Sequence, residues 1–412
     1  MDEYHHGKKL RLSVGRKAPE QGKKVIYLDN SATTRQYEEV NRVMLDAMEE
    51  FFGNPSSLHH LGLLSEKKIK EARAEIAGAF GASPEEIYFT SCGTESDNTA
   101  IFGAARARQR AGKHIITTCV EHPAVLEPCK KLEQQGWQVT YLPVNSEGFV
   151  TAGQVAAALT KETVLVSVMA VNNESGCIMP IEEIGKKIKE YNNANGTGIL
   201  FHSDMVQSFG KKHFNMKNID LASVSAHKIH GPKGMGALYV KKGINIEPFL
   251  LGGGQEKHFR SGTENVPSIL GFGEAVRICE ANFEKRVKSM SEVKIKLLEG
   301  IKKNIPDVRI NTPEHDSVCS VLNVSFPGTR GEVLLHTLEQ SEIYVSTGSA
   351  CASNHKNKKG SHVLVAMGLS PKEVEGAIRF SFSEFTTADD IEKTVEAVTA
   401  AVMRFRKLGS FR

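Results

Sequence analysis

The sequence lacks the features that define several classes of protein. None of its 412 residues lies in a stretch approaching the roughly 20 apolar residues of a membrane-spanning helix. The seven cysteines are an odd number and form no Cys-x-x-Cys pair, which argues against a disulfide framework and a structural zinc site. Lysine plus arginine exceeds aspartate plus glutamate by only 52 to 48, so nothing indicates nucleic acid or a membrane as partner. We therefore expect a cytoplasmic protein with reduced thiols and no metal.

The composition that remains is that of an ordinary globular protein, with 40% hydrophobic and 24% charged residues. Residues 1–24 differ from the rest because they are basic and poor in apolar side chains, and we expect a flexible basic N-terminal tail. From residue 25 onward, short β-branched and apolar segments alternate with segments of helical spacing. Seven of the strand-like segments lie at 85–90, 114–119, 137–142, 163–170, 198–204, 219–226 and 236–240.

This alternation predicts an α/β fold, because strands that are apolar on both faces belong to a mostly parallel sheet covered by helices. Beyond about residue 268 the pattern changes to one long charged helix, expected over 268–304, followed by a smaller α+β region. That region has expected strands at 320–326, 342–346 and 377–383 and expected helices near 331–340 and 388–407. We expect a large domain over 38–280 and a small domain made of 25–37 and 281–412.

Polar residues follow several of the expected strands, and ligands of parallel sheets bind at the carboxyl ends of the strands. Lys228 directly follows a buried segment, where desolvation lowers the pKa of an amine and makes it a usable nucleophile. Ser225 and His227 flank it. Asp204 ends another apolar segment, with Gln207 three residues later. A buried carboxylate needs a cation such as the protonated pyridine nitrogen of pyridoxal phosphate, although Asp204 could instead cap a helix.

Other candidates lie in turns between strands and helices. Gly93 and Thr94 open a helix whose first amides suit an anion such as phosphate. His122 could stack on a planar cofactor and move protons, or be an ordinary loop residue. Asn173 can donate or accept a hydrogen bond. Thr263 lies in a glycine-rich segment that is typical of a phosphate-contacting loop, a subunit contact or a flexible linker.

Two residues stand out against their surroundings. Arg379 lies in an otherwise apolar strand and requires a carboxylate, supplied either by an amino-acid substrate or by a structural ion pair. Cys351 lies among small and polar residues rather than hydrophobic ones, so it could be a nucleophile, a metal ligand or an unreactive thiol.

The order of these motifs along the chain resembles that of the cysteine desulfurases, which are class V enzymes of the aminotransferase-like, fold type I group. The resemblance covers about residues 25–390 and narrows to the long-loop branch with Ser-Gly-Ser-Ala-Cys, which reads Thr-Gly-Ser-Ala-Cys at 347–351. The motifs that carry it are YLDNSATT, FGNPSS, FTSCGTESDN, EHPAV, VNNESG, SAHKIHGPKG, RSGTEN, STGSAC and IRFS.

The resemblance implies that Lys228 binds pyridoxal 5′-phosphate as a Schiff base and that Asp204 pairs with the ring nitrogen. It implies catalytic roles for Cys351, Lys228 and His122, and substrate binding by Asn173 and Arg379. The cofactor-binding set implied is Gly93, Thr94, His122, Asn173, Asp204, Gln207, Ser225, His227, Lys228 and Thr263. Because Thr263 would come from the partner subunit, the resemblance also implies a homodimer.

The implied reaction converts L-cysteine to L-alanine and leaves a persulfide on Cys351, which passes its sulfur to an acceptor protein such as an iron–sulfur scaffold. The basic residues near Cys351, which include Lys356, Lys358 and Lys359, would attract acidic acceptors. Three alternatives are weighed beside this one: selenocysteine lyase activity, a plain class V aminotransferase, and a catalytically inactive scaffold.

Overall fold

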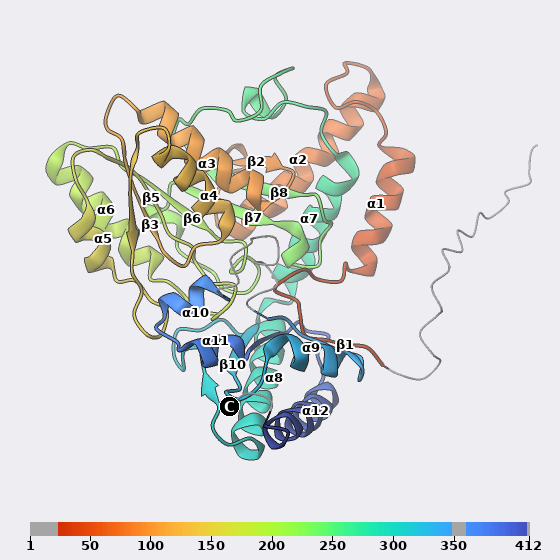
Figure 1. Ribbon diagram of the computed structural model, residues 1–412. Helices are drawn as coiled ribbons and strands as arrows, with labels where there is room; N and C mark the ends of the chain where they lie inside the picture. The colour runs from red at the N-terminus through yellow and green to blue at the C-terminus, as the bar shows by residue number, and fades with distance from the viewer. Residues whose placement is uncertain (1–23, 348–359, 410–412) are drawn as a thin grey trace, which may run out of the picture.

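A seven-stranded sheet forms the centre of the molecule (Figure 1). The computed structural model describes residues 24–347 and 360–409. The strand order is β2-β8-β7-β6-β5-β3-β4, and β8 is antiparallel to both of its neighbours while the other pairs are parallel. The mostly parallel seven-stranded sheet expected from the sequence is therefore confirmed. Its strands are β2 (Ile87–Thr90), β3 (His114–Thr118), β4 (Gln138–Leu142), β5 (Thr163–Ser167), β6 (Leu200–Asp204), β7 (Leu221–Ser225) and β8 (Gly236–Val240).

The strands are apolar on both faces because successive side chains enter two different hydrophobic cores. In β5, Leu165 packs into the core on the side of α3 (Gly93–Arg108) and α4 (Pro123–Glu133), whereas Val166 packs into the core on the opposite side. In β6, Leu200 likewise packs into the core beside α3 and α4, and Phe201 packs into the opposite core. The period of two in a strand sends neighbouring residues to opposite faces, which explains the continuous apolar segments of the sequence.

Helices cover both faces of this sheet. α3 and α4 pack on each other and cover one face, while α2 and α7 pack together on the other side, with α1 against α7. None of the helices in the described ranges is long and apolar enough to span a membrane. The remaining helices of this part are α1 (Glu38–Glu50), α2 (His60–Phe80), α5 (Ala152–Ala158), α6 (Ile181–Asn195) and α7 (Val266–Ala281).

The single helix expected over 268–304 is wrong, because the structure has two helices there. α7 ends at Ala281, and α8 (Phe283–Asn304) begins after Asn282, whose φ of −119° and ψ of 15° are not helical. The sequence has no glycine or proline at this point, so periodicity alone gave no sign of the break. The break has a tertiary cause: α7 packs into the core of the large sheet, whereas α8 packs into a second core.

That second core belongs to a smaller group of elements below the sheet (Figure 1). β10 lies between β9 and β12 in an antiparallel sheet, and β1 pairs in parallel with β11. Ile26 and Leu28, near the start of the described chain, pack into this core. Its elements are β1 (Ile26–Tyr27), β9 (Arg309–Ile310), β10 (Val321–Ser325), α9 (Gly331–Glu339), β11 (Ile343–Tyr344), β12 (Ala377–Ser381) and α12 (Ala388–Lys407), together with α8. Two short helices, α10 (His362–Ala366) and α11 (Pro371–Glu375), lie beside them but direct apolar side chains such as Leu364 and Val374 to the core of the large sheet.

The tail at residues 1–23 lies outside the described residues, and so does the segment 348–359, which contains Cys351. The expected flexible tail stays a prediction for that reason.

Candidate active site

Lys228 ends a short 3-10 turn, Ala226–Lys228, that directly follows β7. Its Nζ donates hydrogen bonds to the backbone carbonyl oxygens of Ser31, at 2.6 Å, and Ala32, at 2.8 Å. The amine is therefore held at the carboxyl end of the sheet by a segment almost 200 residues earlier in the chain.

The segment around Thr34 packs along the loop that follows Lys228. Thr34 donates to the His227 carbonyl oxygen from both its backbone nitrogen and its hydroxyl, and its hydroxyl accepts from the His230 backbone nitrogen at 2.7 Å. His230 has a φ of 64°, a left-handed conformation that is unfavourable for a residue with a Cβ. Because the loop adopts this conformation, the contacts with Thr34 stabilise it and define where Lys228 sits.

Asp204 lies at the end of β6, the strand next to β7, and is 7% exposed. One of its carboxylate oxygens accepts from the Val206 backbone nitrogen at 2.9 Å. Burial raises the pKa of Asp204 to about 6, while the Val206 hydrogen bond and the charge of Lys228 act in the opposite direction. Gln207 donates to the Ser31 carbonyl oxygen at 2.9 Å, and its buried Oε1 has no partner among the described residues.

The start of α3 forms a close approach between backbone and neighbouring side chains. A Cβ on Gly93 would lie 2.8 Å from Cγ2 of Val206 and 3.6 Å from Cβ of Ser225, so only glycine fits without movement. The Ser225 hydroxyl is buried and makes no hydrogen bond within the described chain. Thr94 is exposed in the first turn of α3. This combination of free first-turn amides and an unpaired hydroxyl is suited to an anion.

His227 and Thr263, the other predicted phosphate contacts, are placed differently. His227 shares a hydrogen bond of 3.2 Å with the Thr33 hydroxyl, and burial followed by the charge of Lys228 lowers its pKa to about 4. Thr263 is exposed in the segment before α7. Over residues 24–347 and 360–409, Thr263 makes no hydrogen bond to any other predicted site residue.

His122 caps α4, because its Nδ1 accepts from the Ala124 backbone nitrogen at 3.1 Å. Burial, with the charges of Lys228 and His362, lowers the pKa of His122 to about 4. The ring is therefore neutral at pH 7, and since Nδ1 accepts a hydrogen bond, its proton lies on Nε2.

Two buried acids near His122 and Asp204 were missed in the sequence. Glu121 accepts from the Thr118 hydroxyl at 2.8 Å and from the Met169 backbone nitrogen at 3.0 Å, and burial raises its pKa to about 8. Asp97 on α3 lies 3.5 Å from Nε2 of the buried His202, and burial together with Asp204 raises its pKa well above the ordinary value. The available signal was an acid within a buried pattern: Glu121 lies three residues after β3, in the turn before α4, and Asp97 lies among small residues of α3.

Arg379 has the carboxylate that its burial requires. Its guanidinium donates to Oδ1 of Asp29 at 2.9 Å and to the Asn173 carbonyl oxygen at 3.0 Å, and its Nε has no partner within the described ranges. The structural ion pair considered from the sequence is thus present. Asp29 itself lies in the YLDN motif but was not identified as a functional residue.

The two flanks of the segment that contains Cys351 are attached beside these residues. On one side, Ser346 exchanges two backbone hydrogen bonds with Arg379, at 3.1 and 2.8 Å. On the other side, the Ser361 hydroxyl donates to the buried Glu174, and the His362 ring lies 3.0 Å from the Glu121 carbonyl oxygen. The described residues on both sides of segment 348–359 therefore contact residues of the site.

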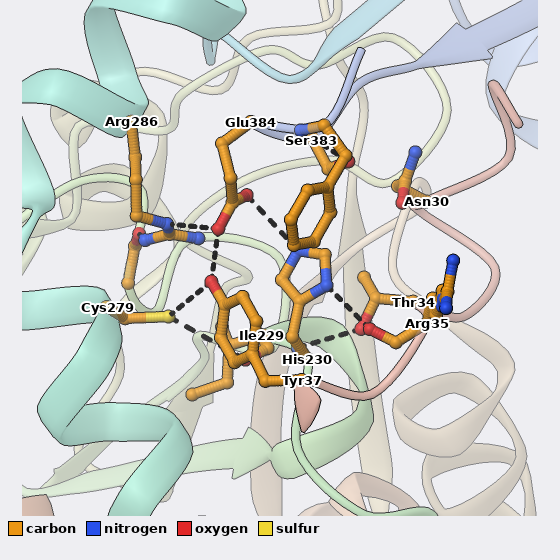
Figure 2. Close-up of polar contacts among 12 residues, drawn as sticks. Asn30, Thr34, Arg35, Tyr37, Ile229, His230, Cys279, Arg286, Ser383 and Glu384 are labelled. Atoms are coloured by element: carbon orange, nitrogen blue, oxygen red, sulfur yellow. Dashed lines mark hydrogen bonds and ion pairs between the residues drawn. The ribbon is translucent and has the colours of Figure 1, made fainter. Parts of the chain in front are cut away.

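A buried polar cluster ties these parts together (Figure 2). Glu384 accepts from Nε of Arg286 at 2.9 Å and from the Tyr37 hydroxyl, and its other oxygen lies 3.2 Å from Nε2 of His230. Arg286, on α8, also donates to the Gly210 carbonyl oxygen at 2.8 Å. Burial alone would raise the pKa of Glu384, but the His230 hydrogen bond and the charge of Arg286 hold it well below its usual range.

Glu384→Gln is expected to lower the free energy of unfolding by about 3 kcal/mol at pH 7, because it leaves the buried Arg286 charge unpaired. Urea unfolding measures this difference. Since folding depresses the Glu384 pKa, the stabilisation is present above the ordinary carboxyl pKa and is lost as the pH falls below it. The difference in unfolding free energy between wild type and variant should therefore decrease below about pH 4.

The matched control is Glu375→Gln, because the Glu375–Arg330 pair is 3.0 Å long but about half exposed on both sides. Exposed pairs contribute little, and we expect a loss of less than about 1 kcal/mol. Equal losses in the two variants, or a gap for Glu384→Gln that does not change with pH, would contradict the assigned role of Glu384.

The family model described as Aminotransferase class-V matches residues 26–394. A cysteine desulfurase from Nostoc sp. is 44% identical over 390 residues, covering 94% of this chain and 95% of the relative. The cysteine desulfurase IscS of Dictyoglomus turgidum is 43% identical, covering 95% of this chain and 98% of the relative.

Solved structures agree with these relatives. A structure described as a NifS-like protein superposes with a TM-score of 0.86 at 38% sequence identity, covering 92% of this chain and all of the other. A NifS-like protein from Rickettsia africae superposes with a TM-score of 0.81 at 32% identity. With these matches spanning nearly the whole length on both sides, the chain belongs to the class V aminotransferase family and, within it, to the cysteine desulfurases.

Proposed function

We propose that this chain removes sulfur from L-cysteine with pyridoxal 5′-phosphate bound at Lys228, giving L-alanine and a persulfide on Cys351. The observation that carries the proposal is a convergence at one end of the sheet. Lys228, the buried Asp204 and the cradle around Gly93 lie where both flanks of the Cys351 segment are attached. The family membership supports the same reaction.

The residues present fit the cofactor. The buried Ser225 hydroxyl lacks a partner within the described chain, and Gly93 keeps the approach to the α3 amides open, as a phosphate group requires. Asp204 is a buried carboxylate with a raised pKa, which a protonated ring nitrogen would stabilise as the anion. The unpaired Gln207 Oε1 is a further polar atom at this site. When bound, the cofactor supplies an electron sink for negative charge on the substrate Cα.

The other residues of the set position the substrate and move protons. In this proposal Lys228, as the neutral amine, accepts the α-proton of cysteine. His122, neutral and protonated at Nε2, would donate or accept a proton during the reaction. Arg379 binds the substrate carboxylate, supported by its unpaired Nε and its position beside the Asn173 carbonyl oxygen.

The nucleophile in this proposal is the thiolate of Cys351. Cys351 lies outside the described residues, four positions after Thr347 in the sequence. Thr347 follows Ser346, which is paired with Arg379. An unperturbed thiol is only a few per cent ionised at pH 7, so nearby cations such as Lys356 would increase the reactive fraction.

The test supplies the purified holoenzyme with L-cysteine and a thiol reductant and measures alanine, persulfide and keto acid. We expect alanine and sulfide in equal amounts and, without reductant, about one persulfide per site. Production of keto acid would instead identify an aminotransferase, and faster alanine release from selenocysteine than from cysteine would identify a selenocysteine lyase. If no product forms, the result would support the alternative of a catalytically inactive scaffold.

A homodimer forms part of this proposal, with Thr263 of the partner subunit reaching the phosphate. Exposed large apolar side chains support it, because a surface group of this kind is typical of a protein interface. They lie on α1, on α2 and between them, namely Leu45, Met48, Phe52, Leu58, Leu61 and Leu63.

We also propose a large domain over 38–280 and a small domain made of 25–37 and 281–412, and the second hydrophobic core supports this division. A cytoplasmic location is proposed as well, because the cysteine pattern is typical of reduced thiols.

Replacing Lys356, Lys358 and Lys359 together with glutamine is expected to slow sulfur transfer to an acidic acceptor severalfold, because charge attraction accelerates encounter. Alanine formation with a small-molecule reductant should be spared. The measurement compares both rates for the same preparation at low and high salt, since screening should remove the difference between variant and wild type. Unchanged transfer at low salt would defeat this hypothesis about the acceptor.

A further inference from the structure

A pocket lies between α8 and the turn that follows β6, with a cavity of about 620 Å³. Its charged lining residues are Lys211, Lys212, Lys294, Lys302, Glu147 and Glu314, so four cations face two acids. Both acids are exposed, and neither forms an ion pair with a lysine within the described chain. We call this site the basic pocket. Its volume lies within the range of small-molecule sites.

Lys211 is the most deeply buried of these cations, at 7% exposed. Among residues 24–347 and 360–409, its ammonium group has no hydrogen-bond or ion-pair partner. Burial lowers the pKa of Lys211 to about 8, and the charge of Arg286 acts in the same direction, whereas Cys319, Cys279 and Glu384 act against it. A buried charge without a partner is costly, so this lysine is placed for an anion that the chain does not itself supply.

Lys294 faces the same cavity from α8. Its Nζ donates at 2.8 Å to the Ser317 hydroxyl and to the Val318 carbonyl oxygen, both of which are uncharged. Burial lowers the pKa of Lys294 to about 8 as well. The basic pocket thus combines two partly desolvated amines with hydroxyl groups of Ser291 and Ser317.

We propose that the basic pocket binds a small molecule carrying a phosphate group, whose oxygens accept hydrogen bonds from Lys211 and Lys294. Lysine ammonium groups bind phosphate as point charges, whereas recognition of a carboxylate is typical of the planar fork of arginine. The cavity is larger than inorganic phosphate needs, which favours an organic phosphate or a diphosphate. This site is separate from the cradle at Gly93 and does not depend on the proposed reaction.

The experiment titrates inorganic pyrophosphate into the holoenzyme and follows the heat of binding. The holoenzyme is used because its cofactor already fills the phosphate cradle at Gly93. We expect one pyrophosphate per chain with a dissociation constant below about 1 mM. Lys211→Met and Lys294→Met should each weaken binding about tenfold or more, because each removes a charge-assisted hydrogen bond.

The matched control is Lys186→Met, an exposed lysine on α6 outside the pocket, which should change the affinity less than twofold. Thermal melting shows whether each variant is folded, and Lys294→Met serves should Lys211→Met not fold. No binding to wild type, or binding that neither pocket variant weakens, would overturn the proposal. Citrate binding as tightly as pyrophosphate would overturn the assignment to phosphate.

Discussion

Lys228→Ala is expected to lower the rate of alanine formation from L-cysteine by about 10³-fold or more, as removal of an essential nucleophile does in other enzymes. The variant loses the amine that would bind the cofactor and accept the α-proton. Among residues 24–347 and 360–409, Lys228 is the lysine whose charge acts on Asp204. It should also fail to acquire the yellow colour of the cofactor-bound protein. Alanine release and visible absorbance of the same preparation measure the two effects.

Lys242→Ala provides the control, because Lys242 is an exposed lysine just after β8 and outside the site. Its activity should stay within about twofold of wild type, as expected for an exposed surface substitution. Lys228→Ala also removes the hydrogen bonds to the Ser31 and Ala32 carbonyl oxygens, so thermal melting must show that it is folded. A folded Lys228→Ala that forms alanine at the wild-type rate would rule out the proposed function.

Cys351→Ser is expected to lower alanine formation by about 10²-fold or more while the cofactor still binds. A serine hydroxyl is not ionised near pH 7 and cannot replace a thiolate in attack on the substrate sulfur. The variant should therefore keep the yellow colour that Lys228→Ala loses, yet form no persulfide. Mass spectrometry of the intact protein after reaction with L-cysteine detects the added sulfur directly.

Cys119→Ser is the matched control for this variant, since Cys119 is a half-buried free thiol after β3. It should carry a persulfide in the same proportion of sites as wild type. A persulfide that persists in Cys351→Ser would place the sulfur acceptor on a different cysteine and refute the role of residue 351.

The sequence by itself determined the central sheet and the positions of most polar candidates. Strands such as β5 and β6 are short, apolar on both faces and separated by helices, and these are local patterns. Because the carboxyl ends of parallel strands share one edge, the sequence alone assigns Asp204 and Lys228 to the same edge of the sheet.

The break at Asn282 shows the limit of such patterns. No glycine or proline lies at the junction of α7 and α8, and only packing into two different cores separates the helices. A periodicity records which side of a helix is buried but not which core it is buried in.

Only the tertiary structure decided which charges meet across long stretches of chain. Arg379 was expected to find a carboxylate, yet its partner Asp29 is 350 residues away. Glu384 joins Tyr37, His230 and Arg286 in the same way. Lys211, in contrast, forms no ion pair with an acid within the described chain. Pairing of buried charges depends on distances of a few ångströms between distant segments, and no local pattern of residues encodes those distances.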